Sequence, residues 1–96
     1  MLTADRVYIS DNLHDYTNID MPVKYQPIKQ LNEVYIGDGC WIGENVCIIG
    51  ASIGKNSVIG ANAVVMKDIP DYCVAVGAPA RVIKKYDFDL QEWIKC

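Results

Sequence analysis

The chain has 96 residues, of which 51% are hydrophobic and 22% are charged, and its formal net charge is −3. These values fit one small globular domain and exclude a disordered chain. The acidic balance argues against nucleic acid or an anionic membrane surface as the main partner. Because the sequence contains neither a signal-like start nor an apolar run of about 18 residues, we expect a cytoplasmic protein without membrane insertion.

The first segment in chain order, residues 3–9, is typical of a strand that ends one side of a larger unit. Val7 and Ile9 alternate along it, and both are predicted to point inward. Residues 10–33 then lose any period and are rich in Asp, Asn and Pro, which favour turns. They predict a loop extruded from the scaffold, and such loops often carry functional residues.

An aliphatic residue recurs about every six positions over the next segment. These residues are Ile36, Ile42, Ile48, Ile53, Ile59 and Val65. Glycine directly follows four of them, and the residues four positions after those four are Cys40, Val46, Ser57 and Ala63. A six-residue period fits neither a helix nor a free strand, but it fits a hexapeptide β-helix, in which each hexamer forms one side of a triangular coil. We therefore predict an all-β solenoid with aliphatic residues inside and glycines that let the backbone turn.

The step from Ile48 to Ile53 is one residue short, which predicts a tightened corner with Gly50 as its hinge. Residues 67–71 are interpreted as the end of the regular pattern. A last strand is expected at 72–76, a turn at 77–80, and a short amphipathic strand or helix at 88–95. The predicted organisation is one domain, residues 1–96, with a loop at about 10–33, coils at about 34–76 and a C-terminal extension at about 77–96.

His14 is the only histidine of the chain, and it lies in the polar loop. Histidine titrates near neutral pH and can therefore accept a proton from an alcohol or an amine. Either an acid or a backbone carbonyl would orient its ring, and Asp11 and Asp15 are within reach along the sequence. We predict His14 as a general base with Asp11 and Asp15 as candidate orienting residues. An inert surface histidine is the alternative.

Two pairs of small residues, Gly60-Ala61 and Gly77-Ala78, lie on or just after the predicted coils. They would leave a thin rim where a long ligand could bond to main-chain groups. Corner geometry alone is an equally good explanation for Gly60. A metal site is not expected, because one histidine per chain permits a three-histidine zinc site only on a three-fold axis.

A basic cluster, Arg81, Lys84 and Lys85, follows the last turn. It could bind phosphates, and a solvated surface patch is the alternative. Trp41 occupies an outward position of its hexamer. An exposed tryptophan usually packs against a subunit or a ligand.

These features together resemble the hexapeptide-repeat acyltransferases, and specifically the sugar O-acetyltransferase group that includes maltose and galactoside acetyltransferases. The matching stretches are His14-Asp15-Tyr16, Pro22-Val23 with Gln26, residues 36–43, residues 53–65, Lys67-Asp68-Ile69-Pro70 and residues 76–83. The resemblance covers about residues 7–86. Compared with this family the chain is short at its N-terminal side, where further coils are expected.

The resemblance implies a left-handed parallel β-helix, usually a homotrimer, with active sites between neighbouring subunits. It also implies that His14 deprotonates an acceptor hydroxyl, which then attacks the thioester of acetyl-CoA without a metal. The pantetheine arm is expected along the coils, and the nucleotide near the last turn with its phosphates facing basic residues. The residues expected to bind acetyl-CoA are Trp41, Gly43, Gly60, Ala61, Ala78, Arg81 and Lys84.

The sequence therefore predicts an acetyl-CoA-dependent O-acetyltransferase acting on a sugar or a surface-polysaccharide precursor. Two alternatives stay open. One is a non-catalytic trimerisation remnant of such an enzyme, and the other is an acetyltransferase for an amine or an amino acid.

Overall fold

The computed structural model describes residues 1–15 and 17–96. Tyr16, one of the residues that carry the resemblance, lies outside the described part of the chain. The described residues form short strands, one three-residue 3-10 helix and many tight turns. No helix among them is long and apolar enough to cross a membrane.

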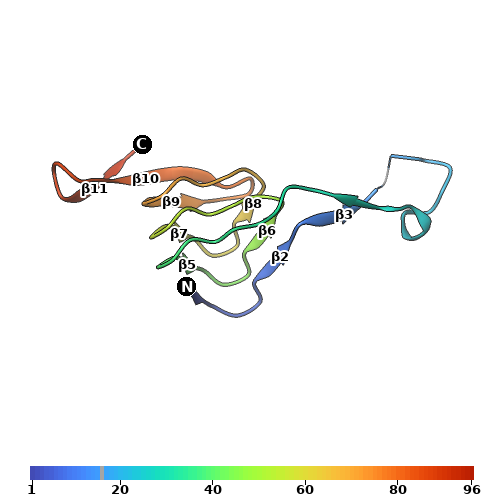
Figure 1. Cartoon of the computed structure of the whole chain (residues 1–96), viewed down its shortest axis with the longest axis horizontal. Helices are drawn as coiled ribbons and strands as arrows, with labels where there is room; N and C mark the ends of the chain where they lie inside the picture. Colours follow the sequence, from blue (N-terminus) through green and yellow to red (C-terminus); the bar gives the residue numbers. More distant parts are fainter. Residues whose placement is uncertain (16) are drawn as a thin grey trace.

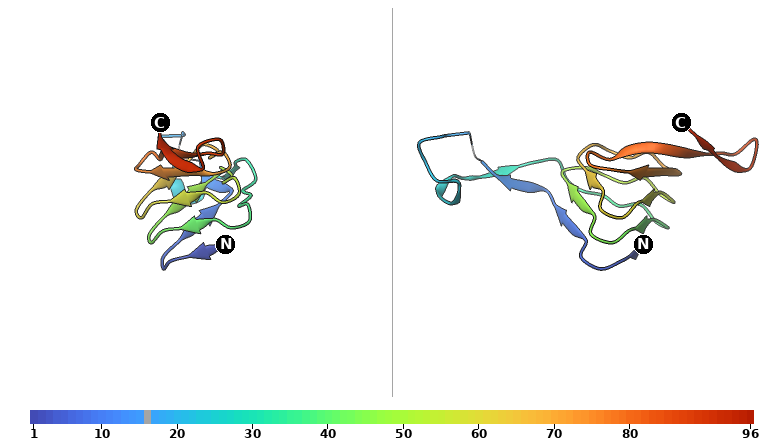
Figure 2. Two further views of the ribbon diagram at one scale, coloured as in Figure 1. Left: turned by 90° about the vertical axis from the view of Figure 1, so that its left-hand side faces the viewer. Right: turned by 180° about the vertical axis from the view of Figure 1, so that it is seen from behind.

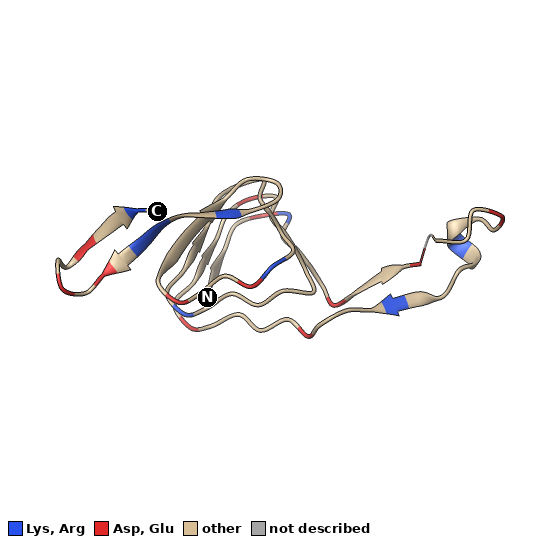
Figure 3. Ribbon diagram, turned by 90° about the horizontal axis from the view of Figure 1, so that it is seen from above, with Lys and Arg blue, Asp and Glu red and all other residues tan. Residues whose placement is uncertain are grey.

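Three parallel ladders run along the body of the molecule and form the three sides of a triangular prism (Figure 3). The first side contains β1 (Leu2–Thr3), β5 (Trp41–Ile42), β7 (Val58–Ile59) and β9 (Cys73–Val76). The second side contains β2 (Tyr8–Ser10), β6 (Cys47–Ile49) and β8 (Val64–Val65). The third side consists of single parallel bridges that join Ile36 to Ile53 and Ile53 to Ile69.

From residue 34 onward, each coil stacks on the next with a shift of 16 or 17 residues, as the pairs Trp41–Val58 and Val58–Val74 show. This shift is close to three hexamers, so the six-residue period is the length of one side. The pattern also continues beyond residue 65, because Ile69 extends the third ladder and residues 73–76 extend the first. Parallel coils of this kind form a β-helix, as the repeat predicts.

The interior of the prism contains the predicted aliphatic and small residues. Those that are at most 2% exposed include Cys40, Ile42, Val46, Ile48, Ile53, Ser57, Ile59, Ala63 and Val65. Burial of each aliphatic side chain contributes on the order of 2 kcal/mol, so this column is the main source of stability. Ser57 is compatible with the interior because its hydroxyl donates a 2.8 Å hydrogen bond to the carbonyl of Pro70.

The glycines that follow the aliphatic residues have a role different from the predicted one. They are not the residues that turn the backbone, because a left-handed φ occurs instead at Gly39, Asn45, Asn56, Asn62 and Tyr72, just before each small interior residue. A Cβ on Gly43 would lie 2.7 Å from the amide nitrogen of Ala61 in the next coil. These glycines are therefore required for close packing between coils. Gly50, with φ of +60°, is a hinge at the shortened step, as predicted.

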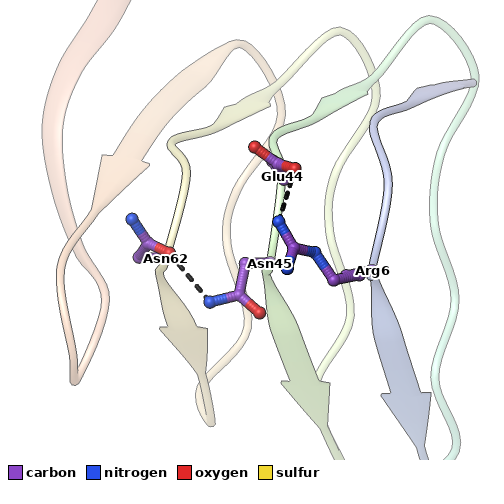
Figure 4. Close-up of polar contacts among 4 residues, drawn as sticks. All are labelled: Arg6, Glu44, Asn45 and Asn62. Atoms are coloured by element: carbon purple, nitrogen blue, oxygen red, sulfur yellow. Dashed lines mark hydrogen bonds and ion pairs between the residues drawn. The ribbon is translucent and has the colours of Figure 1, made fainter.

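Side-chain contacts connect successive corners along the stack (Figure 4). The side-chain nitrogen Nδ2 of Asn45 donates a 2.9 Å hydrogen bond to the side-chain oxygen of Asn62. Arg6 forms an exposed 3.0 Å ion pair with Glu44 of the following coil. The asparagines combine tolerance of left-handed backbone with a bond to the neighbouring coil.

Within the segment predicted as a loop, residues 11–31 leave the prism and form a paired arm rather than an irregular loop. β3 (Asn12–His14) pairs antiparallel with β4 (Ile28–Gln30), and the 3-10 helix η1 (Val23–Tyr25) lies near the far end. This arm, defined here as residues 11–31, projects from the coils (Figure 1). It contributes to the elongated extents of 56 × 24 × 20 Å. The absence of alternating hydrophobicity explains why the sequence did not reveal its strands.

The two ends of the stack differ from the predictions in detail. Ile9 is in register with the fully buried Ile48, which agrees with its predicted inward direction, yet it is 43% exposed because no described coil covers it. At the other end, β10 (Arg81–Asp87) pairs antiparallel with β9 and with β11 (Glu92–Lys95), so residues 88–95 contain a strand rather than a helix. This hairpin extends beyond the coils, and the two termini lie at opposite ends of the stack (Figure 2).

Candidate active site

His14 is the last residue of β3 and lies on the arm, opposite Ile28 in the ladder. Its ring nitrogen Nδ1 lies 3.3 Å from the backbone carbonyl oxygen of Gln26. A carbonyl oxygen can only accept a hydrogen bond, so this contact requires a proton on Nδ1. The neutral ring then has its lone pair on Nε2, and no hydrogen bond from a described residue reaches that atom. This is the tautomer that a general base acting through Nε2 needs.

The two candidate orienting acids have contacts of their own. The carboxylate of Asp11 accepts a 3.0 Å hydrogen bond from the side chain of Asn12. The carboxylate of Asp15 accepts hydrogen bonds from the backbone and the hydroxyl of Thr17, at 2.9 and 2.7 Å. The sequence left open whether an acid or a backbone carbonyl orients the ring. The observed contact of the ring is with a backbone carbonyl, that of Gln26. The orienting roles of Asp11 and Asp15 stay predictions.

Gln26 is a residue to which sequence reasoning assigned no role. It is only 5% exposed, although it lies on an arm whose other residues are mostly exposed. Its side-chain nitrogen donates to the carbonyls of Asn18 and Met21, at 2.9 and 2.8 Å, and its side-chain oxygen accepts from the amide of Asn18 at 3.3 Å. A polar residue between an aromatic residue and a proline gives no sequence signal for such burial.

Four of the predicted ligand-binding residues, Trp41, Gly43, Gly60 and Ala61, line one mainly apolar groove with a volume of about 450 Å³. Its other lining residues are Ala4, Glu44, Val58 and Ile59. The register explains the shape, because Thr3, Ile42 and Ile59 are aligned and the small residues that follow them, Ala4, Gly43 and Gly60, stack along one corner of the prism. Trp41, 53% exposed, forms one wall of the groove, in agreement with its predicted outward position.

The other three predicted residues, Ala78, Arg81 and Lys84, line a second cavity of about 590 Å³ beside the C-terminal hairpin. Lys95 and Cys96 line it too, and sequence reasoning did not identify them.

Lys85, a member of the basic cluster, is not among the lining residues of the second cavity. Lys84 pairs with Lys95 across the hairpin, whereas Lys85 pairs with Ile94. Side chains of successive strand residues point to opposite faces, which separates Lys85 from the other two lysines. Figure 3 shows the basic residues of β10 and β11 near the C-terminus.

The groove and the second cavity adjoin at the corner of the coils. Gly60 lines the groove, Val76 lines the second cavity, and these two residues are in contact. His14 lies elsewhere, because the arm and the strands β5, β7 and β9 are on opposite sides of the prism in Figure 1. A single chain therefore presents the predicted donor-binding residues in one place and the imidazole in another.

A triangular stack of coils with hexamer sides, close-packed glycines and an extruded histidine arm defines a hexapeptide-repeat β-helix protein. Residues 33–67 match the family model described as the hexapeptide repeat of succinyl-transferase. The coils are similar to the crystal structure of a maltose O-acetyltransferase from Clostridium difficile, with a TM-score of 0.74 and 44% identity over 88% of this chain and 44% of that chain.

Two further proteins extend this likeness. The structure of a galactoside acetyltransferase in complex with coenzyme A has a TM-score of 0.72 and 40% identity over 83% of this chain and 39% of that chain. A protein of Escherichia coli K12 named as a lipopolysaccharide biosynthesis O-acetyl transferase is 37% identical over 101 aligned positions, which cover 98% of this chain and 52% of that protein.

The chain belongs to the hexapeptide-repeat acyltransferases and is related to their sugar O-acetyltransferase group, as the sequence motifs indicate. It spans between 28% and 52% of the length of the first three curated relatives that it matches.

Proposed function

We propose that this chain provides the donor-binding coils and the catalytic base of an acetyl-CoA-dependent O-acetyltransferase. Its acceptor is a hydroxyl of a sugar or of a surface-polysaccharide precursor. The observation that carries the proposal is the imidazole of His14, which has Nδ1 engaged by a carbonyl and Nε2 without a partner among the described residues. The relatives named as maltose, galactoside and lipopolysaccharide acetyltransferases support the acceptor class.

In this proposal, Nε2 of His14 takes the proton of the acceptor hydroxyl while its oxygen attacks the carbonyl carbon of the acetyl thioester. A carbon–oxygen bond forms, the carbon–sulfur bond breaks, and the proton passes to the departing thiolate of coenzyme A. Acetyl-CoA supplies an acyl group that is already activated, so positioning and one base suffice. The contact between Nδ1 and the Gln26 carbonyl stabilises the imidazolium that forms during the transfer.

The two adjoining cavities fit the two ends of the donor. The apolar groove at Trp41, Gly43, Gly60 and Ala61 is suited to the pantetheine arm, because small residues leave the backbone accessible. Arg81 and Lys84 of the second cavity carry the positive charge that phosphates require, and Ala78 leaves room at the turn. These assignments are the ones that the family resemblance implies.

We further propose a left-handed coil and a homotrimer in which the site forms between copies. The separation of His14 from both cavities within one chain supports this arrangement, because the arm can only complete the site against the groove of a neighbouring copy. The arm also exposes several large apolar side chains, which favour burial against another surface. They are Ile19, Met21, Val23, Tyr25 and Ile28. Residues 1–96 would then act as a single domain within the assembly.

Calorimetric titration with coenzyme A, followed by an acetyl-transfer assay on sugars and on amines, tests the proposed function. Binding together with transfer to a sugar hydroxyl is the expected result. Binding with transfer only to amines would replace the O-acetyltransferase with the amine alternative. If coenzyme A binds but no acceptor in the panel is acetylated, or if it does not bind, the non-catalytic remnant is favoured. The part of each relative that lies outside the matched region gives this last alternative its physical basis.

A further inference from the structure

The arm contains a buried glutamine that holds its far end closed. Gln26 uses both polar atoms of its side chain, bonding the carbonyls of Asn18 and Met21 and the amide of Asn18. Its own backbone amide donates a 3.0 Å hydrogen bond to the carbonyl of Val23. Residue 26 is thus fixed through its side chain and through its amide, and the direction of its carbonyl is set by both.

That carbonyl is the group that faces the imidazole of His14. Two features of the backbone bring β3 and β4 together beside this carbonyl. His14 is paired with Ile28 in the ladder, and the backbone amide of Asp15 donates a 2.9 Å hydrogen bond to the carbonyl of Pro27. The ladder places the two residues near each other, but it does not by itself aim the carbonyl at Nδ1. Aiming requires that the backbone at residue 26 cannot rotate.

We propose that Gln26 is a positioning residue whose side-chain amide, by closing the turn from Asn18 to Met21, directs its own backbone carbonyl at His14 and thereby fixes the ring as the Nδ1–H tautomer. This inference rests on the proposed function for its purpose, since only a base acting through Nε2 needs that tautomer. The tautomer itself is a property of the folded chain. It can therefore be measured whether or not the chain transfers an acetyl group.

The test is nitrogen-15 NMR of the imidazole in the complete chain, recorded at about pH 9 to observe the neutral ring. His14 is the only histidine, so its two ring nitrogens give the only imidazole signals. A protonated nitrogen and a lone-pair nitrogen resonate far apart, and the wild-type chain is expected to show Nδ1 protonated. A wild-type spectrum with Nε2 protonated, or with both signals averaged, would overturn the proposal.

Gln26→Glu is the decisive variant, because it keeps the length of the side chain and the oxygen that accepts from Asn18 but cannot donate to two carbonyls. We expect its imidazole signals to shift towards an averaged pair. The expected fall in kcat is on the order of 10²-fold, with an unchanged KM for acetyl-CoA, because misplacement of a catalytic group by about 1 Å has an effect of that size. An unchanged tautomer in a folded Gln26→Glu chain would contradict the proposal.

Gln30→Glu is the matched control. Gln30 lies on the same arm, is exposed, and also donates from its side chain to two carbonyls, those of Asp11 and Leu31. It should leave the imidazole signals and kcat unchanged, whereas an equal shift in both variants would reduce Gln26 to a general structural role. If Gln26→Glu does not fold, Gln26→Asn retains the amide but is one methylene too short to reach both carbonyls. The same tautomer shift is then expected of it.

The two proposals can fail separately. If the Gln26→Glu variant loses the Nδ1–H tautomer but the wild-type chain transfers no acetyl group, Gln26 is the positioning residue and the proposed function is rejected. If the variant keeps the tautomer and the wild-type chain is active, the proposed function stands and the role of Gln26 is rejected.

Discussion

Gly60 lies directly against Val76 of the next coil, and a Cβ built on Gly60 would lie 2.7 Å from Cγ1 of Val76. The next atoms, Cβ of Val76 and the carbonyl oxygen of Ala75, are 3.5 and 3.8 Å away. One methyl group of one side chain therefore accounts for the whole overlap. Both residues lie where the groove adjoins the second cavity, so the spacing of the coils and the shape of the groove depend on the same contact.

We predict that Gly60→Ala destabilises the fold by about 1–3 kcal/mol, because overpacking displaces the neighbouring side chain. The combination with Val76→Ala removes Cγ1 and should recover most of that loss. Urea unfolding of the two single variants and the double variant gives the coupling energy. Strictly additive effects would show that the Val76 methyl group is not the obstacle.

The corner at Asn62 provides a second prediction about stability. Asn62 has φ of +64° and accepts a hydrogen bond from Asn45. Asn62→Ala should destabilise the fold for two reasons. A left-handed backbone costs about 1–2 kcal/mol for a residue with a Cβ, and the lost hydrogen bond is worth about 1 kcal/mol. Asn62→Gly loses only the bond and should be the more stable variant in thermal unfolding. The reverse order would mean that backbone conformation is not what selects asparagine at this corner.

Much of the prism could be predicted because the same six-residue pattern of aliphatic residues occurs several times in the sequence. Ile42, Ile48 and Ile59 occupy equivalent positions, and each copy of the pattern supports the interpretation of the others. The role of Gly43 and Gly60 could not be assigned in the same way. A glycine required for close approach and a glycine required for a turn look alike in a sequence, and only the positions of neighbouring coils distinguish them.

The arm shows the opposite case. His14 stands out as the only histidine, so residue type alone marked it as a candidate. The contact to its ring comes from a backbone carbonyl, which has no signature in a sequence, and the burial of Gln26 depends on a turn formed by residues 18–21. The pairing of Lys84 with Lys95 likewise depends on a hairpin register that a short amphipathic segment does not specify.

The basic residues of the second cavity allow a prediction about donor binding. Arg81→Ala and Lys84→Ala should each weaken binding of coenzyme A about tenfold or more, since a charge-assisted hydrogen bond is worth roughly 1.5–3 kcal/mol. Lys85→Ala is the matched control, because it removes the same charge from the opposite face of the same strand. Calorimetric titration measures all three. Equal losses in Lys84→Ala and Lys85→Ala would indicate long-range charge attraction instead of a phosphate contact.

The Cys73 thiol is expected to make the stability of the fold depend on pH. Burial raises the pKa of the Cys73 thiol above its ordinary value of 9.0, with a further contribution from Cys96, and the nearby Lys85 acts in the opposite direction. In the unfolded chain the thiol ionises first, so the folded state loses stability as pH rises from the unfolded to the folded pKa. We therefore expect urea midpoints to fall above about pH 9 in the wild type and less steeply in Cys73→Ala. Cys96→Ala, which removes an exposed thiol, should retain most of the wild-type slope.

The last prediction concerns the proposed base. His14→Ala should lower kcat by about 10²-fold or more and leave the affinity for coenzyme A nearly unchanged, because the proposed base acts on the acceptor hydroxyl and is not a lining residue of either donor cavity. His14→Asn separates structure from chemistry, since its side-chain amide can donate to the Gln26 carbonyl in place of Nδ1 but cannot accept a proton at neutral pH. We expect His14→Asn to keep the thermal stability of the wild type and to be as inactive as His14→Ala. Wild-type turnover in either variant, measured with saturating acetyl-CoA, would remove His14 from the mechanism and leave the arm with a role in assembly alone.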